Sequence, residues 1–146
     1  MNIPSLTLSL LGEATVELTV VAALVATGLF AAMAALQAAL AAGAPLGTHV
    51  LGGRHTGALP PRLRAFSGIA ALLLLGFALV MLARTEVIGW PAAIAGILIP
   101  ASWAIAGFLA LNTLGNVASK SRFERTVLAA TTAVLAVLCG FVAVTA

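Results

Sequence analysis

Charged side chains are scarce in this sequence. Asp, Glu, Lys and Arg make up 8% of its 146 residues, and Asp is absent altogether. A water-soluble domain usually carries about 25% charged residues, so this chain lacks the polar surface that keeps a globule in solution. Its seven Lys and Arg residues are too few for a nucleic-acid binder, and a single cysteine excludes a disulfide-stapled scaffold. What the chain has instead is 62% hydrophobic residues, which indicates an integral membrane protein.

Four segments are long and apolar enough to cross a membrane, which takes roughly 20 helical residues at about 1.5 Å each. They cover residues 17–42, 65–83, 91–115 and 126–145. We therefore expect an all-α fold, a four-transmembrane-helix bundle that forms one domain over residues 1–146. The apolar residues 1–12 are too few to cross alone, so we expect them to lie at the interface or to extend the first helix. No Lys or Arg precedes this stretch, so a cleaved signal peptide is not expected.

Positive charge lies almost entirely on one side of these spans. Cytoplasmic loops of membrane proteins are enriched in Lys and Arg, so this bias predicts a multi-pass protein of the bacterial cytoplasmic membrane with both termini outside. Residues 43–64 and 118–125 are then cytoplasmic, and the link over 84–90 is external. The expected inner side carries Arg54, Arg62, Arg64, Lys120, Arg122 and Arg125, and the expected outer side carries Arg84 alone.

Local signals mark where the later helices begin and bend. Ser121 followed by Glu124 is a capping-box pattern, in which each side chain satisfies a backbone N–H group of the other residue. Pro100 falls inside the expected third helix, where its missing N–H predicts a kink. Trp103 then lies near the middle of the bilayer, either wedged between helices or walling a small lipophilic pocket.

Rows of small residues predict which helix faces pack together. Lipid tails are as apolar as leucine, so helices associate in a bilayer through close approach at small residues and a few hydrogen bonds. In the first helix, Ala31, Ala35 and Ala39 recur every four residues and so share one face, and a second row consists of Ala34, Ala38 and Ala42. Both rows are candidate packing faces.

A layer of polar side chains is expected near the cytoplasmic ends of the helices. Gln37 lies near the end of the first helix, Ser67 near the start of the second, and Asn112 and Asn116 share a face at the end of the third. Amides in hydrocarbon are costly unless they are paired, so these groups should point into the bundle. The layer is either structural or the floor of a site that opens inward beneath the first loop.

The first loop, residues 43–64, is not an ordinary linker. Its leucines and valine favour burial, which predicts that it folds back against the helix ends. Consecutive glycines let backbone N–H groups converge on an anion, and nearby basic residues add positive charge. A lipid phosphate is the expected ligand, the alternative being arginines that contact headgroups without selectivity. The candidate anion site comprises Gly52, Gly53, Arg54, His55, Arg62, Arg64, Lys120 and Arg122.

Two glutamates offer a different function. Glu13 and Glu17 are four residues apart and share a face at the outer end of the first helix. A carboxylate within the membrane could bind a proton or a lipophilic cation, as in a small proton-coupled exporter with Trp103 beside the path. The other interpretation is that both acids stay solvated and complement the helix dipole.

Few residues remain for catalysis or for a cofactor. The two histidines, His49 and His55, both lie in the first loop, and a lipid-modifying enzyme that uses one of them is a third hypothesis. Metal ligands normally come together from several His, Cys or carboxylate residues, which this chain scatters over both sides. We therefore expect no metal, no cofactor and no catalytic residue.

The loop motifs GAPLG, LGG and LPPRLR, together with NTLGNVASKSRFER after the third span, resemble those of small, uncharacterised bacterial four-span membrane proteins. The resemblance covers about a third of the chain. It implies the four-helix inner-membrane architecture and carries no established activity. Where aromatic residues often stand in that group, this chain has Leu46 and Leu51.

These observations predict an integral membrane protein without catalytic activity of its own. Its expected role is accessory or binding: it recognises an anionic lipid headgroup, or a partner membrane subunit or second copy, at its cytoplasmic side. Nucleic acid is not an expected partner.

Overall fold

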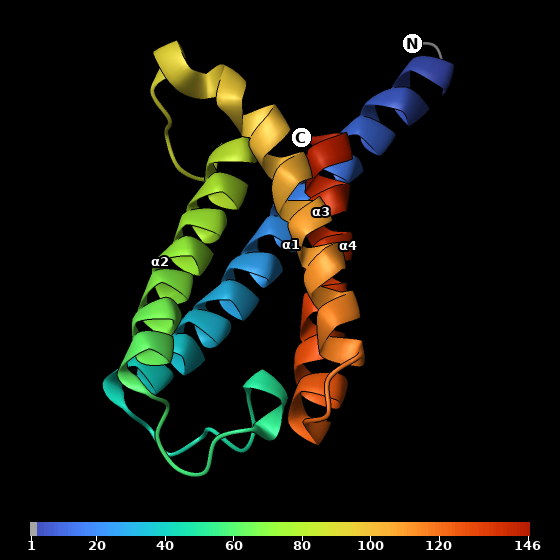
Figure 1. The fold of residues 1–146 in the computed structure, drawn as a ribbon. Coiled ribbons are helices and arrows are strands. Elements are labelled where there is room, and N and C mark those ends of the chain that lie inside the picture. Colours follow the sequence, from blue (N-terminus) through green and yellow to red (C-terminus); the bar gives the residue numbers. More distant parts are fainter. Residues whose placement is uncertain (1–2) are drawn as a thin grey trace.

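The computed structural model describes residues 3–146, and over this range the chain is helical without strands (Figure 1). Two short 3₁₀ segments, η1 and η2, and one π-helical turn, η3, accompany the four long helices. The elements in chain order are α1 Ile3–Ala42, η1 Leu51–Gly53, α2 Pro61–Arg84, η2 Ala92–Ile97, α3 Leu98–Val117, η3 Glu124–Leu128 and α4 Ala129–Thr145.

Four helical stretches are long and apolar enough to cross a membrane: Leu10–Ala42, Pro61–Arg84, Ala92–Val117 and Glu124–Thr145. The opening residues continue α1 as helix from Ile3, the second of the two arrangements expected for them. Many large apolar side chains on the outer faces are exposed, among them Leu72, Leu111 and Val137. Such an exterior suits hydrocarbon better than water.

The helices form two hairpins. In Figure 1, α1 runs beside α2, and α3 runs beside α4, while α2 and α3 pack over a shorter stretch. Both termini lie at one end together with the α2–η2 link, and we call this the termini end. The opposite end holds residues 43–60 and the turn before α4, and we call it the loop end. The hairpins meet through α1 and α4 towards the termini end and spread apart towards the loop end.

The main core runs along the facing sides of the helices, and its α1 contribution consists largely of alanines. Ala23 and Ala26 are fully buried there beside Phe30. Of the two rows expected to pack, that of Ala31, Ala35 and Ala39 does not supply the core, since the first two are exposed, whereas Ala34 of the second row is buried in it. Helical periodicity identifies residues that share a face, but not which face is turned inward.

The start of the third span differs from the expected kinked helix. A 3₁₀ segment, η2, precedes α3, so Pro100 falls in the first turn of α3 rather than in its middle. Backbone N–H groups of a first turn have no partner within the α-helix, so proline is tolerated there. Trp103 is 51% exposed on the outer surface, and it lines neither of the two main cavities.

Candidate functional site

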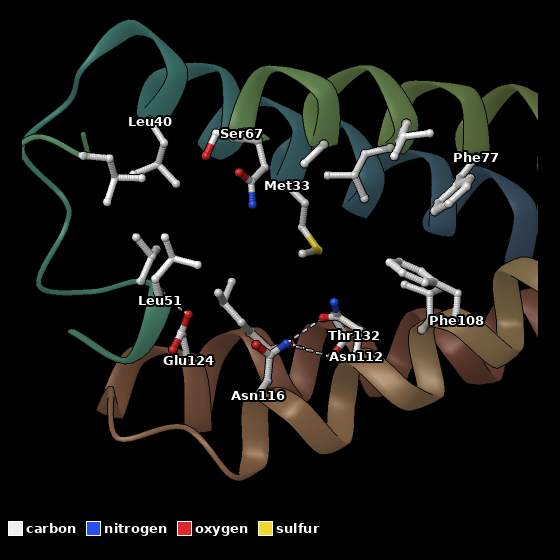
Figure 2. Close-up of a pocket in the computed structure, with 18 residues that line it drawn as sticks. Met33, Leu40, Leu51, Ser67, Phe77, Phe108, Asn112, Asn116, Glu124 and Thr132 are labelled. Carbon is white, nitrogen blue, oxygen red and sulfur yellow. Dashed lines mark hydrogen bonds between the residues drawn. The ribbon is translucent and has the colours of Figure 1, made fainter. Parts of the chain in front are cut away.

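A cavity of about 260 Å³ lies between the two hairpins at the loop end. Figure 2 shows the 18 residues that line it, with Ser67 and Met33 on one side facing Asn116 and Thr132 on the other. All four residues of the expected polar layer contribute to the lining: Gln37, Ser67, Asn112 and Asn116. The structure therefore brings these side chains of α1, α2 and α3 to one cavity, although Asn112 is exposed and not turned fully into the bundle.

The polar wall formed by α3 and α4 is held by hydrogen bonds. The Asn116 side-chain N–H group donates to Asn112 Oδ1 at 3.0 Å and to the Thr132 hydroxyl oxygen at 3.4 Å. Thr132 is fully buried and also receives the Thr113 hydroxyl at 2.9 Å. Sequence reasoning missed both threonines, although hydroxyls on facing helices are a common source of such bonds.

The opposite wall has unused hydrogen-bonding capacity. Within the part of the chain that the structure describes, neither the Gln37 amide nor the Ser67 hydroxyl makes a side-chain hydrogen bond, although Ser67 is buried. Both line the cavity. Gln37 is partly buried, and polar groups that line a cavity can fix the orientation of a partner that enters it.

The remainder of the cavity is apolar and reaches the outer surface. Phe77 of α2 and Phe108 of α3 meet edge to face with ring centroids 5.8 Å apart, and Phe30 packs edge to face on Phe77 at 5.9 Å. Two lining residues, Leu73 and Phe108, are 54% and 50% exposed. The cavity therefore has a polar end beneath the loop and an apolar end at Phe77 and Phe108, and it has exposed lining residues at both ends, Leu51 and Asn112 at the first and Leu73 and Phe108 towards the second.

The first loop covers the polar end. Val50 and Leu59 are buried against Leu40 in a small core of their own, as the loop's apolar composition predicted. Leu51 also lines the cavity, but it is largely exposed. At the other side of the loop, the Arg64 Nε group donates to the Ala41 carbonyl at 2.9 Å and thereby caps the end of α1.

One carboxylate ties this loop to the α3–α4 hairpin. Glu124, only 9% exposed, accepts the backbone N–H groups of Leu51 at 2.6 Å and Gly52 at 2.9 Å, and it also accepts the Ser119 hydroxyl. A second tie is the Ser121 hydroxyl, which donates to the His49 carbonyl at 2.6 Å. The loop is thus fixed by bonds that join residues 72 or 73 positions apart.

The backbone around these N–H groups has an uncommon conformation. Leu51, Gly52 and Gly53 have φ angles of 53°, 73° and 69°, a run of left-handed residues in which the N–H groups of Leu51 and Gly52 turn towards one point, while the Gly53 N–H group donates to the Val50 carbonyl at 2.9 Å. A leucine rarely adopts a positive φ, so the contacts of the loop must hold it there. An anion was expected at this nest, and the group that occupies it is the chain's own Glu124 carboxylate.

The capping box expected at Ser121 and Glu124 is therefore only half formed. The Glu124 N–H group lies 3.4 Å from the Ser121 hydroxyl, but the Ser121 N–H group donates to the Ser119 hydroxyl and not to Glu124. The glutamate side chain is turned towards the loop instead. Residues 124–128, which begin with this glutamate, form a π-helical turn, and such turns are often found at functional positions.

The basic residues of the expected anion site are not gathered around the cavity. Arg54, Arg62, Lys120 and Arg122 are exposed at the loop end, and none of them lines the cavity. His55 is partly buried in the loop, and His49 packs its ring edge to face on Phe123 at 5.9 Å. Within residues 3–146, no three His, Cys, Asp or Glu side chains come together as metal ligands do.

The glutamates of the transport hypothesis lie elsewhere. Glu13 and Glu17 are both exposed on α1 and line neither main cavity. A second cavity, of about 280 Å³, lies at the termini end and is lined by Arg84 and Glu86 among others.

Comparison of the chain with protein-family models, curated proteins and solved structures found no match.

Proposed function

We propose that this protein spans the membrane four times, with the loop end in the cytoplasm and both termini outside, and that it binds an amphiphilic membrane molecule in the cavity between its hairpins. The role is one of binding rather than catalysis. The distribution of Lys and Arg supports the orientation, because the loop end carries every such residue except Arg84.

The observation that carries the binding proposal is the two-sided character of the cavity. Its end beneath the loop offers amide and hydroxyl groups of Gln37, Ser67 and Asn112, whereas its other end is walled by Phe77 and Phe108. Ligand sites are typically apolar with a few polar groups that fix orientation. A lipid has this same division between a polar head and an apolar chain.

The openings of the cavity support a ligand that arrives from the bilayer. The loop lies over the polar end and is held there by Glu124, although Leu51 and Asn112 at that end are themselves exposed. The apolar end opens between α2 and α3, where Leu73 and Phe108 are half exposed. A molecule dissolved in the membrane reaches this opening directly, with its chain remaining in the lipid.

The chemistry of the lining favours binding over turnover. Glu124 is the one titratable side chain among the lining residues, and both of its oxygens already accept hydrogen bonds. Such a carboxylate fixes structure and is poorly placed to act as a general base. For proton-coupled export, Glu17 stands on the exposed surface away from both main cavities, so no contact in the structure favours that alternative.

The test fills the cavity and compares bound lipid. Leu73→Trp places an indole into the opening, and Leu72→Trp places the same ring on the neighbouring residue, which is 71% exposed and outside the lining. Both proteins are purified in mild detergent, and co-purifying lipid is identified by native mass spectrometry. We expect bound lipid in the wild type and in Leu72→Trp, and at least a tenfold loss in Leu73→Trp. Equal lipid content in all three proteins would refute the proposal.

A further inference from the structure

We infer that the head group which enters this cavity is uncharged and carries a hydroxyl, as in a long-chain alcohol. This inference rests on the proposed function and narrows its ligand class. It departs from the anionic headgroup that the basic loop suggested, and it follows from the charges and the hydrogen-bonding groups of the lining.

The lining has no positive charge to receive an anion. None of its 18 residues is Lys, Arg or His, and its one formal charge is the negative charge of Glu124. A phosphate bound in the cavity would lose its hydrating water, would have no cation among the lining residues and would lie near the Glu124 carboxylate. Burial of a charge without a partner of opposite sign is strongly unfavourable.

The backbone groups best suited to a phosphate are already in use. The left-handed turn at Leu51 and Gly52 gives its N–H groups to Glu124. Arg64, which follows the loop, donates to the Ala41 carbonyl at the end of α1. An anionic head would therefore have to break bonds that hold the loop, and the displaced Glu124 carboxylate would be left buried.

The free polar groups of the lining are a mixture of donors and acceptors. Asn112 keeps its side-chain N–H₂ group free while its oxygen receives Asn116. The Gln37 amide offers both a donor and an acceptor, and the Ser67 hydroxyl does the same. A fully ionised phosphate only accepts and an ammonium only donates, so each would leave some of these groups unpaired. A hydroxyl both donates and accepts, and it satisfies both kinds.

The experiment uses three probes that differ only in the head: oleyl alcohol, oleyl phosphate and oleylamine. Each is titrated into the purified full-length protein in detergent micelles, and occupancy is measured by native mass spectrometry. We expect oleyl alcohol to bind at least tenfold more tightly than either charged probe. Gln37→Leu should weaken alcohol binding at least threefold and reduce the preference, whereas Thr126→Val, an exposed change outside the lining, should leave both unchanged.

The outcomes separate the two claims. If Leu73→Trp abolishes binding but oleyl phosphate or oleylamine binds most tightly, the cavity holds a lipid and the uncharged head is wrong. If Leu73→Trp changes the binding of none of the probes, the cavity is not the site and the proposed function fails. If Gln37→Leu preferred the alcohol over the charged probes as strongly as the wild type does, the inference would also be overturned. The preference would then not come from the polar groups of the lining.

Discussion

The Glu124 carboxylate accepts the backbone N–H group of Leu51 at 2.6 Å, across 73 positions of sequence. This bond joins the start of the fourth span to the loop between the first two, and so connects the two hairpins where they are furthest apart. The same carboxylate lines the cavity. The same side chain therefore both helps to hold the loop over the polar end and forms part of the wall of the site.

Replacing that carboxylate by an amide should loosen the loop. Glu124→Gln keeps the shape but removes the negative charge, and an amide nitrogen cannot accept an N–H group. Hydrogen bonds to charged groups contribute roughly 1.5–3 kcal/mol, so we expect amide hydrogen exchange at Leu51 and Gly52 to accelerate at least tenfold. Glu86→Gln, at an exposed glutamate, is the control and should leave both amides unchanged. Equal protection in the two variants would mean that the loop is held by other contacts.

The loop should also be sensitive to one added methyl group. A Cβ atom at Gly47 would lie 2.7 Å from the His55 carbonyl oxygen and 2.8 Å from that of Gly57. Both contacts are with backbone, which cannot move aside, so Gly47→Ala should lower the free energy of unfolding by about 1–3 kcal/mol. Gly107→Ala is the matched change in a helix, where nothing lies within 4 Å, and it should be neutral or slightly stabilising. Thermal unfolding in detergent measures both, and a Gly47→Ala protein as stable as the wild type would contradict the packing described for this loop.

At the termini end the two hairpins are joined by a pair of hydroxyls. Thr19 is buried, and its hydroxyl lies 2.8 Å from that of Thr145, which itself donates to the Phe141 carbonyl. Hydrogen bonds between membrane helices average about 0.6 kcal/mol, so Thr19→Val should destabilise the protein by about that amount. Thr15→Val removes a hydroxyl that bonds only within its own helix and should have a smaller effect. The difference between the two unfolding free energies is the measurement, and a zero or reversed difference would exclude a contribution from the Thr19–Thr145 pair.

The number of long apolar helices could be predicted from sequence because it depends on composition and length alone. The gathering of Gln37, Ser67, Asn112 and Asn116 in one lining followed from the same arithmetic, since rise per residue fixes the depth of each side chain along its helix. Depth places residues in a common layer. The depth of a residue does not indicate whether its polar group has a hydrogen-bond partner. For Gln37 and Ser67, only the structure shows this.

The part played by Glu124 could not be found this way. Its spacing from Ser121 matches a capping box, a local pattern that accounts for the glutamate without any distant partner. Two of its three partners in the structure, Leu51 and Gly52, lie in a loop whose fold depends on left-handed residues and on a small core with Leu40. Local patterns carry no information on such long-range contacts. The glycine pair led to the expectation of an external anion at Gly52 and Gly53, whereas the structure has a side chain of the same protein at the N–H groups of Leu51 and Gly52.

The proposed orientation makes opposite predictions for two exposed positions. Arg54 stands in the loop at one end, and Gly89 stands in the α2–η2 link at the other, where an added side chain meets nothing within 4 Å. Arg54→Cys and Gly89→Cys are each made in a Cys139→Ala background, because the native cysteine is otherwise the one thiol in the chain. A membrane-impermeant maleimide added to intact bacterial cells should label position 89 and leave position 54 unlabelled until the cells are opened, because the Lys and Arg bias places residue 54 inside. The reverse labelling pattern would show that the protein has the opposite orientation in the membrane, with the polar end of the cavity outside. Labelling of both positions in intact cells would mean that the chain does not cross the membrane between them.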